Sequence, residues 1–329
     1  MSDRPAALPA PRAVRARLVM DLLRSLTNSR PIQEHGGLLA ALALLILLSV
    51  AFVPYFGTLS NGLDILRQLA FDGIIALGMT LVIIAGEIDI SVGSAIAFSS
   101  SMFGVLAVNV GLPLWLTTVA VLALGAAIGL GAGFMRAWFN VPSFIVTLAL
   151  FSALKGGALL VTDAIPIPIF DPAFNWWGTG TLFGLPVPAV ILLGLFIVFS
   201  VIAKRTSFGR AVYTIGGNAE AAFLSGIPVM RVRILLFGIT GFLAALSGVL
   251  QTSRLAAGNA GIGTGVEFAV ITAVIVGGTN LFGGKGTMTG TMLGGLFIAV
   301  LNNAMVLLGV NSYAQYVANG GVVLLAVLI

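Results

Sequence analysis

Two acidic residues lie in an unusual place in this sequence, within the segment GEIDISVGS at residues 86–94. Apolar runs flank the segment on both sides, and a carboxylate in such surroundings is costly in lipid. Asp89 or Ser91 can cap the helix that follows, because the first backbone N–H groups of a helix need acceptors. The Asp89 carboxylate can instead act in gating or in a translocation path. Since Ser91 already offers a cap, the sequence favours a role for the charge.

Glu87 has no comparable capping geometry. We therefore expect its carboxylate to reach cytoplasmic water or to meet a partner subunit. The parity of the predicted spans places the segment at or near the cytoplasmic ends of the second and third spans. Gly86, Gly93 and the short second span would also suit a broken helix that enters the membrane.

Further polar residues interrupt the apolar spans, where they are costly unless they face protein or water. For Asn302 and Asn303, hydrogen bonding between helices is favoured over contact with a solute. Glu267 is expected to complement the positive end of its own helix or to line an outer vestibule. The candidate translocation or gating residues are Asp72, Glu87, Asp89, Ser91, Asn302 and Asn303.

The sequence argues against an enzyme. It has no cysteine and a single histidine, His35, so a zinc site is improbable and no catalytic or metal-binding residues are predicted. The stretch LFGGKGT fails as a phosphate-binding loop, because Thr279 stands where the first glycine is required and Gly286 where Ser or Thr would bind magnesium. We expect these glycines to form a tight turn instead.

Composition identifies a membrane protein. Of the 329 residues, 59% are hydrophobic and only 8% are charged, against roughly a quarter charged in soluble domains. Apolar windows long enough to cross a bilayer predict an all-α integral membrane protein with about ten spans, short loops and one compact helical domain. The spans are expected near 38–54, 66–85, 91–108, 114–134, 143–161, 187–203, 234–252, 267–282, 288–308 and 313–329.

Basic residues predict the orientation. They form short clusters beside the apolar runs rather than a continuous stripe, so a nucleic-acid partner is not expected. The basic tail at residues 1–36 and the loop at 204–233 are separated by six crossings and are both predicted to be cytoplasmic. The connection at 162–186 has no Lys or Arg and is predicted to face outward. Lys155 is expected to snorkel towards the outer interface.

A short helix is predicted inside the cytoplasmic loop. Asn218 can cap it, an Ala-rich stretch continues through Leu224, and Gly226 and Pro228 end it. Such a short helix gains little stability alone and needs a surface to pack on, so docking to a partner is favoured over lying on the membrane.

Four stretches carry a family resemblance that covers roughly residues 60–329. GMTLVIIAGEIDISVGS resembles the signature of the permease subunit of bacterial ribose-type sugar ABC importers, within the broader branched-chain amino acid and ribose permease family. FNVPSFIVTLALFSALKGGALLVTD, GGNAEAAFLSGIPVMRVRILLFGITG and ITAVIVGGTNLFGGKGTMTGTMLGGLFIAVLNNAMVLLGV are also similar to that family.

The resemblance implies a multi-pass subunit of the bacterial inner membrane that imports a neutral, ribose-like sugar. It implies a second permease copy, as a homodimer or a paralogous heterodimer, and a periplasmic or extracellular sugar-binding protein. ATP and magnesium would be bound by a separate ABC ATPase subunit and not by this chain. The short loop helix would couple to that ATPase through Gly217, Asn218, Ala221, Ala222, Ser225, Gly226 and Ile227.

Two alternatives remain. The chain could be an ABC permease for branched-chain amino acids or another small solute. It could also be an ion-coupled secondary transporter with Asp72, Asp89 or Glu267 as a proton or sodium site.

Overall fold

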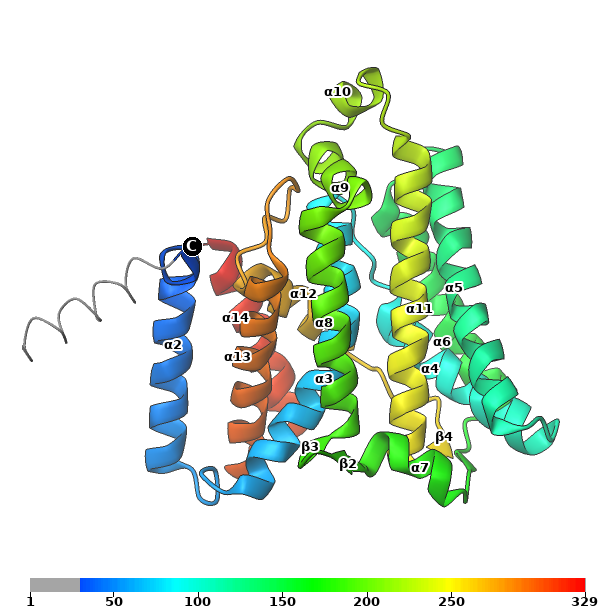
Figure 1. Ribbon diagram of the computed structural model, residues 1–329. Coiled ribbons are helices and arrows are strands. Elements are labelled where there is room, and N and C mark those ends of the chain that lie inside the picture. The colour runs from blue at the N-terminus through cyan, green and yellow to red at the C-terminus, as the bar shows by residue number, and fades with distance from the viewer. Residues whose placement is uncertain (1–29, 329) are drawn as a thin grey trace, which may run out of the picture.

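The computed structural model describes residues 30–328, and these residues are largely helical (Figure 1). The long helices are α2 (Arg30–Phe52), α3 (Leu59–Ile84), α4 (Val92–Gly104), α5 (Leu114–Trp138), α6 (Ser143–Thr162), α8 (Val187–Arg205), α11 (Val229–Leu255), α13 (Met288–Leu307) and α14 (Ser312–Leu328). The shorter ones are the π-helical η1 (Val105–Asn109), α7 (Pro172–Thr179), α9 (Ser207–Gly217), α10 (Ala219–Leu224) and α12 (Val266–Val276). Most of the basic tail predicted at residues 1–36 lies outside the described residues.

Four strands of two residues each pair at one end of the bundle. β1 (Ile167–Pro168) pairs with β4 (Ala257–Gly258), and β2 (Thr181–Leu182) pairs with β3 (Leu185–Pro186), both antiparallel. They tie loops together and contribute nothing to the spans.

The predicted all-α membrane fold is confirmed. Eight helical segments among residues 30–328 are long and apolar enough to cross a membrane. The two other expected spans are α12, which has 11 residues, and α14, which has 17. The predicted span at 267–282 is thus a short helix followed by a glycine-rich turn.

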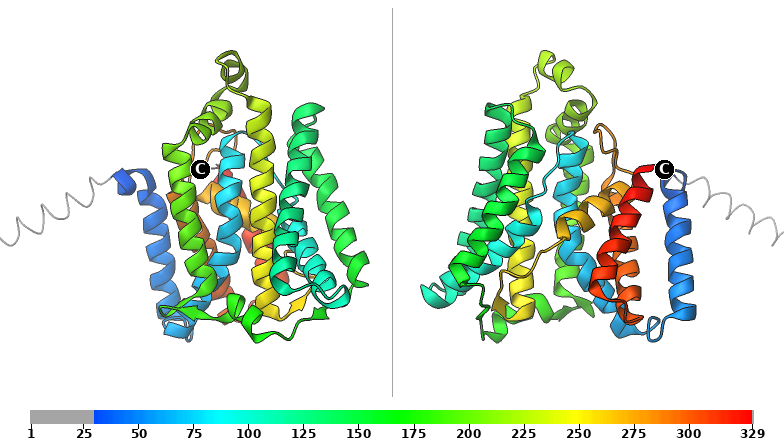
Figure 2. Two further views of the ribbon diagram at one scale, coloured as in Figure 1. Left: turned by 45° about the vertical axis from the view of Figure 1, so that its right-hand side comes forward. Right: turned by 180° about the vertical axis from the view of Figure 1, so that it is seen from behind.

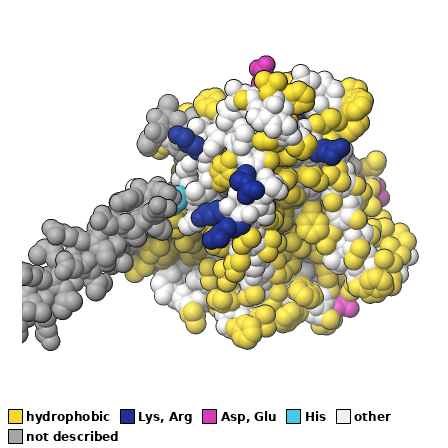
Figure 3. Space-filling model, turned by 45° about the horizontal axis from the view of Figure 1, so that its top comes forward, with side chains coloured by type: hydrophobic (Ala, Val, Ile, Leu, Met, Phe, Trp, Pro, Cys, Tyr) yellow, Lys and Arg dark blue, Asp and Glu magenta, His cyan; other side chains and the backbone are white. Residues whose placement is uncertain are grey.

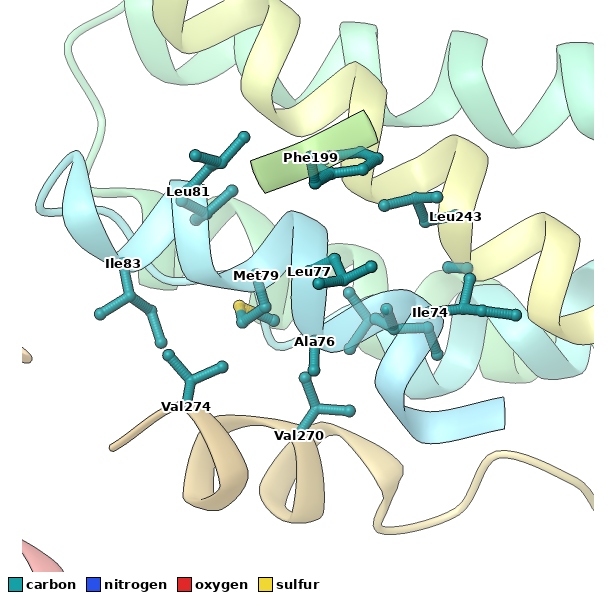
Figure 4. Packing of buried hydrophobic residues seen from close by; sticks show 14 of the residues in the cluster. Ile74, Ala76, Leu77, Met79, Leu81, Ile83, Phe199, Leu243, Val270 and Val274 are labelled. Carbon is teal, nitrogen blue, oxygen red and sulfur yellow. The ribbon is translucent and has the colours of Figure 1, made fainter. Parts of the chain in front are cut away.

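Helix α3 forms the centre of the bundle. In its most apolar window, 83% of the residues are buried inside the protein, against 17% for α2 at the periphery. Figure 4 shows Ile74, Leu77 and Met79 of α3 among side chains from neighbouring helices. Phe199 of α8, Leu243 of α11 and Val270 of α12 belong to the same cluster. Because the carboxyl-terminal half of α3 is surrounded by protein, its end can be held from several directions.

Glycines bring α5 and α11 into close contact, as their spacing predicts. A Cβ at Gly125 would collide with Gly241 and Ala245, and one at Gly129 would collide with the carbonyl oxygen of Phe237. The backbones of α5 and α11 therefore touch along this seam.

The loops gather at two ends of the bundle, which we name the α10 end and the α7 end (Figures 1 and 2). Basic residues cluster over the α10 end, as Figure 3 shows. They include the exposed Lys204, Arg205, Arg210 and Arg231. The segment at 162–186 lies at the opposite, α7 end. The basic loop at 204–233 and the segment at 162–186 thus lie at opposite ends of the bundle, as the predicted order of membrane crossings requires.

The glycine seam gives a matched test of packing. Gly129→Val should destabilise the folded chain by about 3 kcal/mol, because the new side chain must displace the α11 backbone. Gly131→Val is the control, since a Cβ at Gly131 on the same helix meets nothing within 4 Å. Thermal unfolding of both variants in detergent checks the expectation. Equal transition temperatures would refute the close contact between α5 and α11.

Candidate functional site

The segment between α3 and α4 breaks the helix and enters the bundle. Gly86, at φ 75°, ends α3 in a Schellman turn, with hydrogen bonds from Gly86 N to Ile83 O (2.9 Å) and from Glu87 N to Val82 O (3.0 Å). The chain then runs without helical structure to the start of α4 at Val92. Figure 2 shows it passing from the α10 end towards the middle of the bundle. Of the two arrangements that the sequence allowed, the broken helix is therefore correct.

Helix α6 supplies partners for the backbone of this segment. Ile88 N donates to Ser143 Oγ at 3.1 Å, and Ile90 N donates to Thr147 Oγ1 at 3.2 Å. A backbone outside a helix cannot remain unpaired at membrane depth, so these hydroxyls allow the segment to exist there.

Glu87 forms the centre of a buried ion-pair cluster. Its side chain is 3% exposed; Arg136 Nε of α5 donates to Oε2 at 2.9 Å, and Arg233 Nε of α11 lies 2.7 Å from Oε1. The expectation that Glu87 reaches water or a partner subunit is wrong, because two arginines of its own chain neutralise it. The carboxylate thereby ties the break after α3 to α5 and α11.

Asp89 lies deeper, beside the middle of α11. Its Oδ1 accepts hydrogen bonds from Ser91 N (2.9 Å) and Ser91 Oγ (2.6 Å), and its Oδ2 accepts one from Thr240 Oγ1 (3.0 Å). At 1.5 Å per residue, Thr240 lies about 10 Å further along α11 than Arg233. Ser91 precedes α4 without a capping bond from its side chain. Asp89 therefore stabilises the turn before α4 through Ser91, and it binds this turn to α11 through Thr240. These hydroxyl and amide partners favour a structural role over the charge-dependent role expected from the sequence.

The remaining candidates lie apart from this segment. Asp72 on α3 accepts a hydrogen bond from Gln68 at 3.0 Å. Asn303 on α13 exchanges two amide hydrogen bonds with Asn61 on α3, at 3.0 and 2.7 Å, in agreement with the preference for bonding between helices. Asn302 Oδ1 is buried and has no hydrogen-bond partner among residues 30–328.

A second irregular segment enters the bundle from the α7 end. Residues 257–265 lead from α11 to the start of α12 (Figure 2). Gly263 packs so tightly on the backbone of Gly93 that neither residue has room for a Cβ. The amino ends of α4 and α12 therefore meet inside the bundle. This contact could not be predicted from the sequence, because residues 93 and 263 are far apart in the chain and each glycine alone fits many explanations.

The helix in the loop between α9 and α11 forms as predicted. Asn218 Oδ1 accepts a hydrogen bond from Ala221 N at 2.9 Å, and Gly226, at φ 81°, follows the helix end. Ala222 is fully buried against its own chain, whereas Phe223 and Leu224 are 69% and 79% exposed. The apolar face that α10 offers to a partner is therefore formed by Phe223 and Leu224.

The glycine turn between α12 and α13 contacts the carboxyl end of α3, where that helix breaks. Gly283 and Gly284 adopt positive φ angles of 92° and 78° in the turn before α13, as the glycine content predicts. Gly284 N donates to Ile84 O at 2.8 Å. Gly216 of α9 packs against the same Ile84 carbonyl without room for a Cβ. The last residue of α3 is therefore held by α9 and by this turn.

Comparisons with known proteins agree on one family. The model of the family described as "Branched-chain amino acid transport system / permease component" matches residues 61–329. The chain is 48% identical over 300 residues to the probable ABC transporter permease protein YphD of Escherichia coli K12, covering 91% of this chain and 90% of that protein.

The names of two other relatives include a sugar. The ribose import permease protein RbsC of Haemophilus influenzae is 41% identical over 293 residues, covering 87% of this chain and 90% of that protein. The L-arabinose transport system permease protein AraH of Escherichia coli K12 is 35% identical over 297 residues, covering 90% of each chain. No solved structure matches the chain.

The buried ion pairs can be tested against an exposed one. Glu87→Gln should lower the free energy of unfolding by about 3–5 kcal/mol, because it leaves two largely buried arginines without a counter-charge. Asp64→Asn, which breaks the exposed pair with Arg67, should cost no more than about 1 kcal/mol. Thermal unfolding in detergent measures both. If the unfolding temperature of Glu87→Gln is no lower than that of Asp64→Asn, the ion-pair cluster does not stabilise the fold.

Proposed function

The chain belongs to the family of branched-chain amino acid transport system permease components, and on this premise we propose that it is the membrane-spanning subunit of an ABC importer that carries a neutral sugar into the cytoplasm. The irregular segment at 85–91, between α3 and α4, is the observation that supports this proposal most strongly. It is a non-helical backbone held inside the bundle, and membrane proteins tolerate such backbone only where it is buried in protein or lines a path.

The sugar is proposed from the relatives and from the charges of the site. Ribose and arabinose appear in the names of relatives between 35% and 41% identical to this chain. The carboxylate of Glu87 is neutralised by Arg136 and Arg233, and that of Asp89 is occupied by hydroxyl and amide donors. Neither charge is free to hold the ammonium group of an amino acid, which supports a neutral hydroxylated solute.

Helix α10 is the proposed contact with a separate ATPase subunit, which would bind ATP and magnesium. It protrudes from the bundle, and its exposed Phe223 and Leu224 offer an apolar anchor of the kind found at interface centres. The other proposed coupling residues position this face, since Asn218 caps the helix and Gly226 turns the chain back towards α11.

The α10 end is proposed to face the cytoplasm. The exposed basic residues at this end support the assignment, because Lys and Arg are enriched in cytoplasmic loops. The α7 end would then receive sugar from a periplasmic or extracellular binding protein. We also propose that the protein lies in the bacterial inner membrane with its amino terminus in the cytoplasm, and that it works together with a second permease copy.

A substitution on α10 tests the docking proposal. Phe223→Asp should weaken binding of the ATPase subunit by about 2 kcal/mol or more, about 30-fold in Kd, because a carboxylate would be buried in an apolar contact. Phe183→Asp is the matched control, since Phe183 is also exposed but lies at the α7 end. Co-purification of the two subunits in detergent, with the permease folded in each case, measures the effect.

Undiminished binding of the ATPase subunit by Phe223→Asp would leave α10 without a docking role. Equal losses in both variants would point to general misfolding instead of a specific contact. Ala222→Glu is unsuitable for this test, because Ala222 is fully buried and its replacement would disrupt the loop itself.

A further inference from the structure

A row of polar side chains runs along one face of helix α3. Asp64, Gln68 and Asp72 are spaced four residues apart, so they project from the same side of the helix. Asp64 and Gln68 are exposed, and Asp72 is half-buried. Arg67 Nη1 donates to Asp64 Oδ1 at 2.6 Å, and Gln68 Nε2 donates to Asp72 Oδ2 at 3.0 Å. We name these four residues the α3 polar row.

The α3 polar row reaches the middle of a membrane-spanning helix. Helix α3 begins at the α7 end (Figure 1), and at 1.5 Å per residue Asp72 lies about 20 Å along a helix of about 39 Å. The long side chains of Lys and Arg can reach an interface from inside a membrane, but the short side chain of aspartate cannot. A half-buried carboxylate at this depth does not face lipid, so the row faces water or protein.

Helix α11 adds polar side chains beside the row. Arg254 is exposed in the last turn of α11, and its Cζ lies 5.4 Å from the centre of the Phe71 ring. Ser247 Oγ donates to the carbonyl oxygen of Phe71 at 2.9 Å, and the half-buried Gln251 donates to Ser247 Oγ at 3.1 Å. Because Phe71 adjoins Asp72 in α3, these side chains of α11 border the α3 polar row.

Close packing begins where the row ends. One and two turns beyond Asp72, the side chains of Ile75, Ala76 and Met79 are at most 1% exposed. The accessible polar groups of α3 therefore belong to the half of the helix nearest the α7 end, and tightly packed side chains surround the other half. A path that is open to water at one end and sealed at mid-depth requires this arrangement.

We infer that the α3 polar row and Gln251 line a water-filled half of the solute path, next to the α7 end, and bind hydroxyl groups of a passing neutral polyol. Carboxylates accept hydrogen bonds from hydroxyl groups, and the amides of Gln68 and Gln251 both donate and accept. The row together with Arg254 carries two charges of each sign, so this surface has no net charge with which to select an ion. The inference rests on the proposed import function and assigns the residues that meet the sugar.

Cysteine labelling tests whether the row lies in water, because the chain has no cysteine of its own. A thiol reacts as the thiolate, which forms readily in water and not in lipid. A membrane-impermeant methanethiosulfonate, added to intact cells that make the complete importer, should label Gln68→Cys at least about tenfold faster than Leu193→Cys. Added D-ribose should slow the labelling of Gln68→Cys alone.

Leu193→Cys is a stringent control. Leu193 is 53% exposed and lies about 9 Å along α8 from the α7 end, so it is less deep than Gln68, at about 14 Å along α3. Slow labelling of the shallower cysteine would show that the reagent does not reach side chains that face lipid.

Three results of the labelling would overturn the inference. Equal rates for the two variants would place Gln68 outside the water-filled path. A disulfide that joins two Gln68→Cys chains under an oxidant, without labelling by the reagent, would show that a second permease copy covers the row. Labelling that D-ribose does not slow would remove the contact with the sugar.

Uptake by vesicles that contain the complete importer provides a second measurement. Gln68→Leu and Gln251→Leu should each lower the initial rate of ATP-driven D-ribose uptake about tenfold at low sugar, as the loss of one hydrogen bond implies. Leu193→Cys should match the wild type. Normal uptake by both leucine variants would overturn the sugar contact and leave the import function intact. Fast labelling of Gln68→Cys, in a protein whose wild type takes up no D-ribose, would refute ribose import and retain the water-filled row.

Discussion

The structure depends on one constraint, that every backbone polar group inside a membrane must find a partner within the protein. Helices satisfy it by themselves, but the segments 85–91 and 257–265 do not. The first is accommodated because α6 offers the hydroxyls of Ser143 and Thr147 to its N–H groups. Helices α5 and α11, which pack along the glycine seam, hold the same segment through the ion pairs of Arg136 and Arg233 with Glu87.

The contacts around the first break also connect it to the α10 end. Helix α10 lies between α9 and α11 in the chain, and both neighbours touch the end of α3. Helix α9 packs through Gly216 on the Ile84 carbonyl, and α11 reaches Glu87 through Arg233. The two neighbours of α10 in the chain are therefore both in contact with the region where α3 ends. Thr240 of the same α11 donates to Asp89, so α11 also contacts the turn that precedes α4.

Local signals predicted much of this arrangement. The Asn218 cap, the glycine stop after α10, the spans and the helix break at Gly86 each depend on residues close together in the sequence. The pairing of Glu87 with Arg233 could not be predicted in this way, because the arginine also fits the pattern of a topology signal. The contact of Lys155 could not be predicted either, because a cation near a helix end usually reaches the interface, and only the folded chain places the Ala260 carbonyl oxygen 2.8 Å from its Nζ.

The central claim is that this chain forms a solute path that depends on ATP hydrolysis in a separate subunit. It is tested most directly with radiolabelled D-ribose uptake into vesicles that contain the permease alone or with its ATPase subunit and sugar-binding protein. We expect uptake only in the complete system with ATP, and none by the chain alone under a proton or sodium gradient. Gradient-driven uptake by the chain alone would contradict it, and would indicate an ion-coupled transporter.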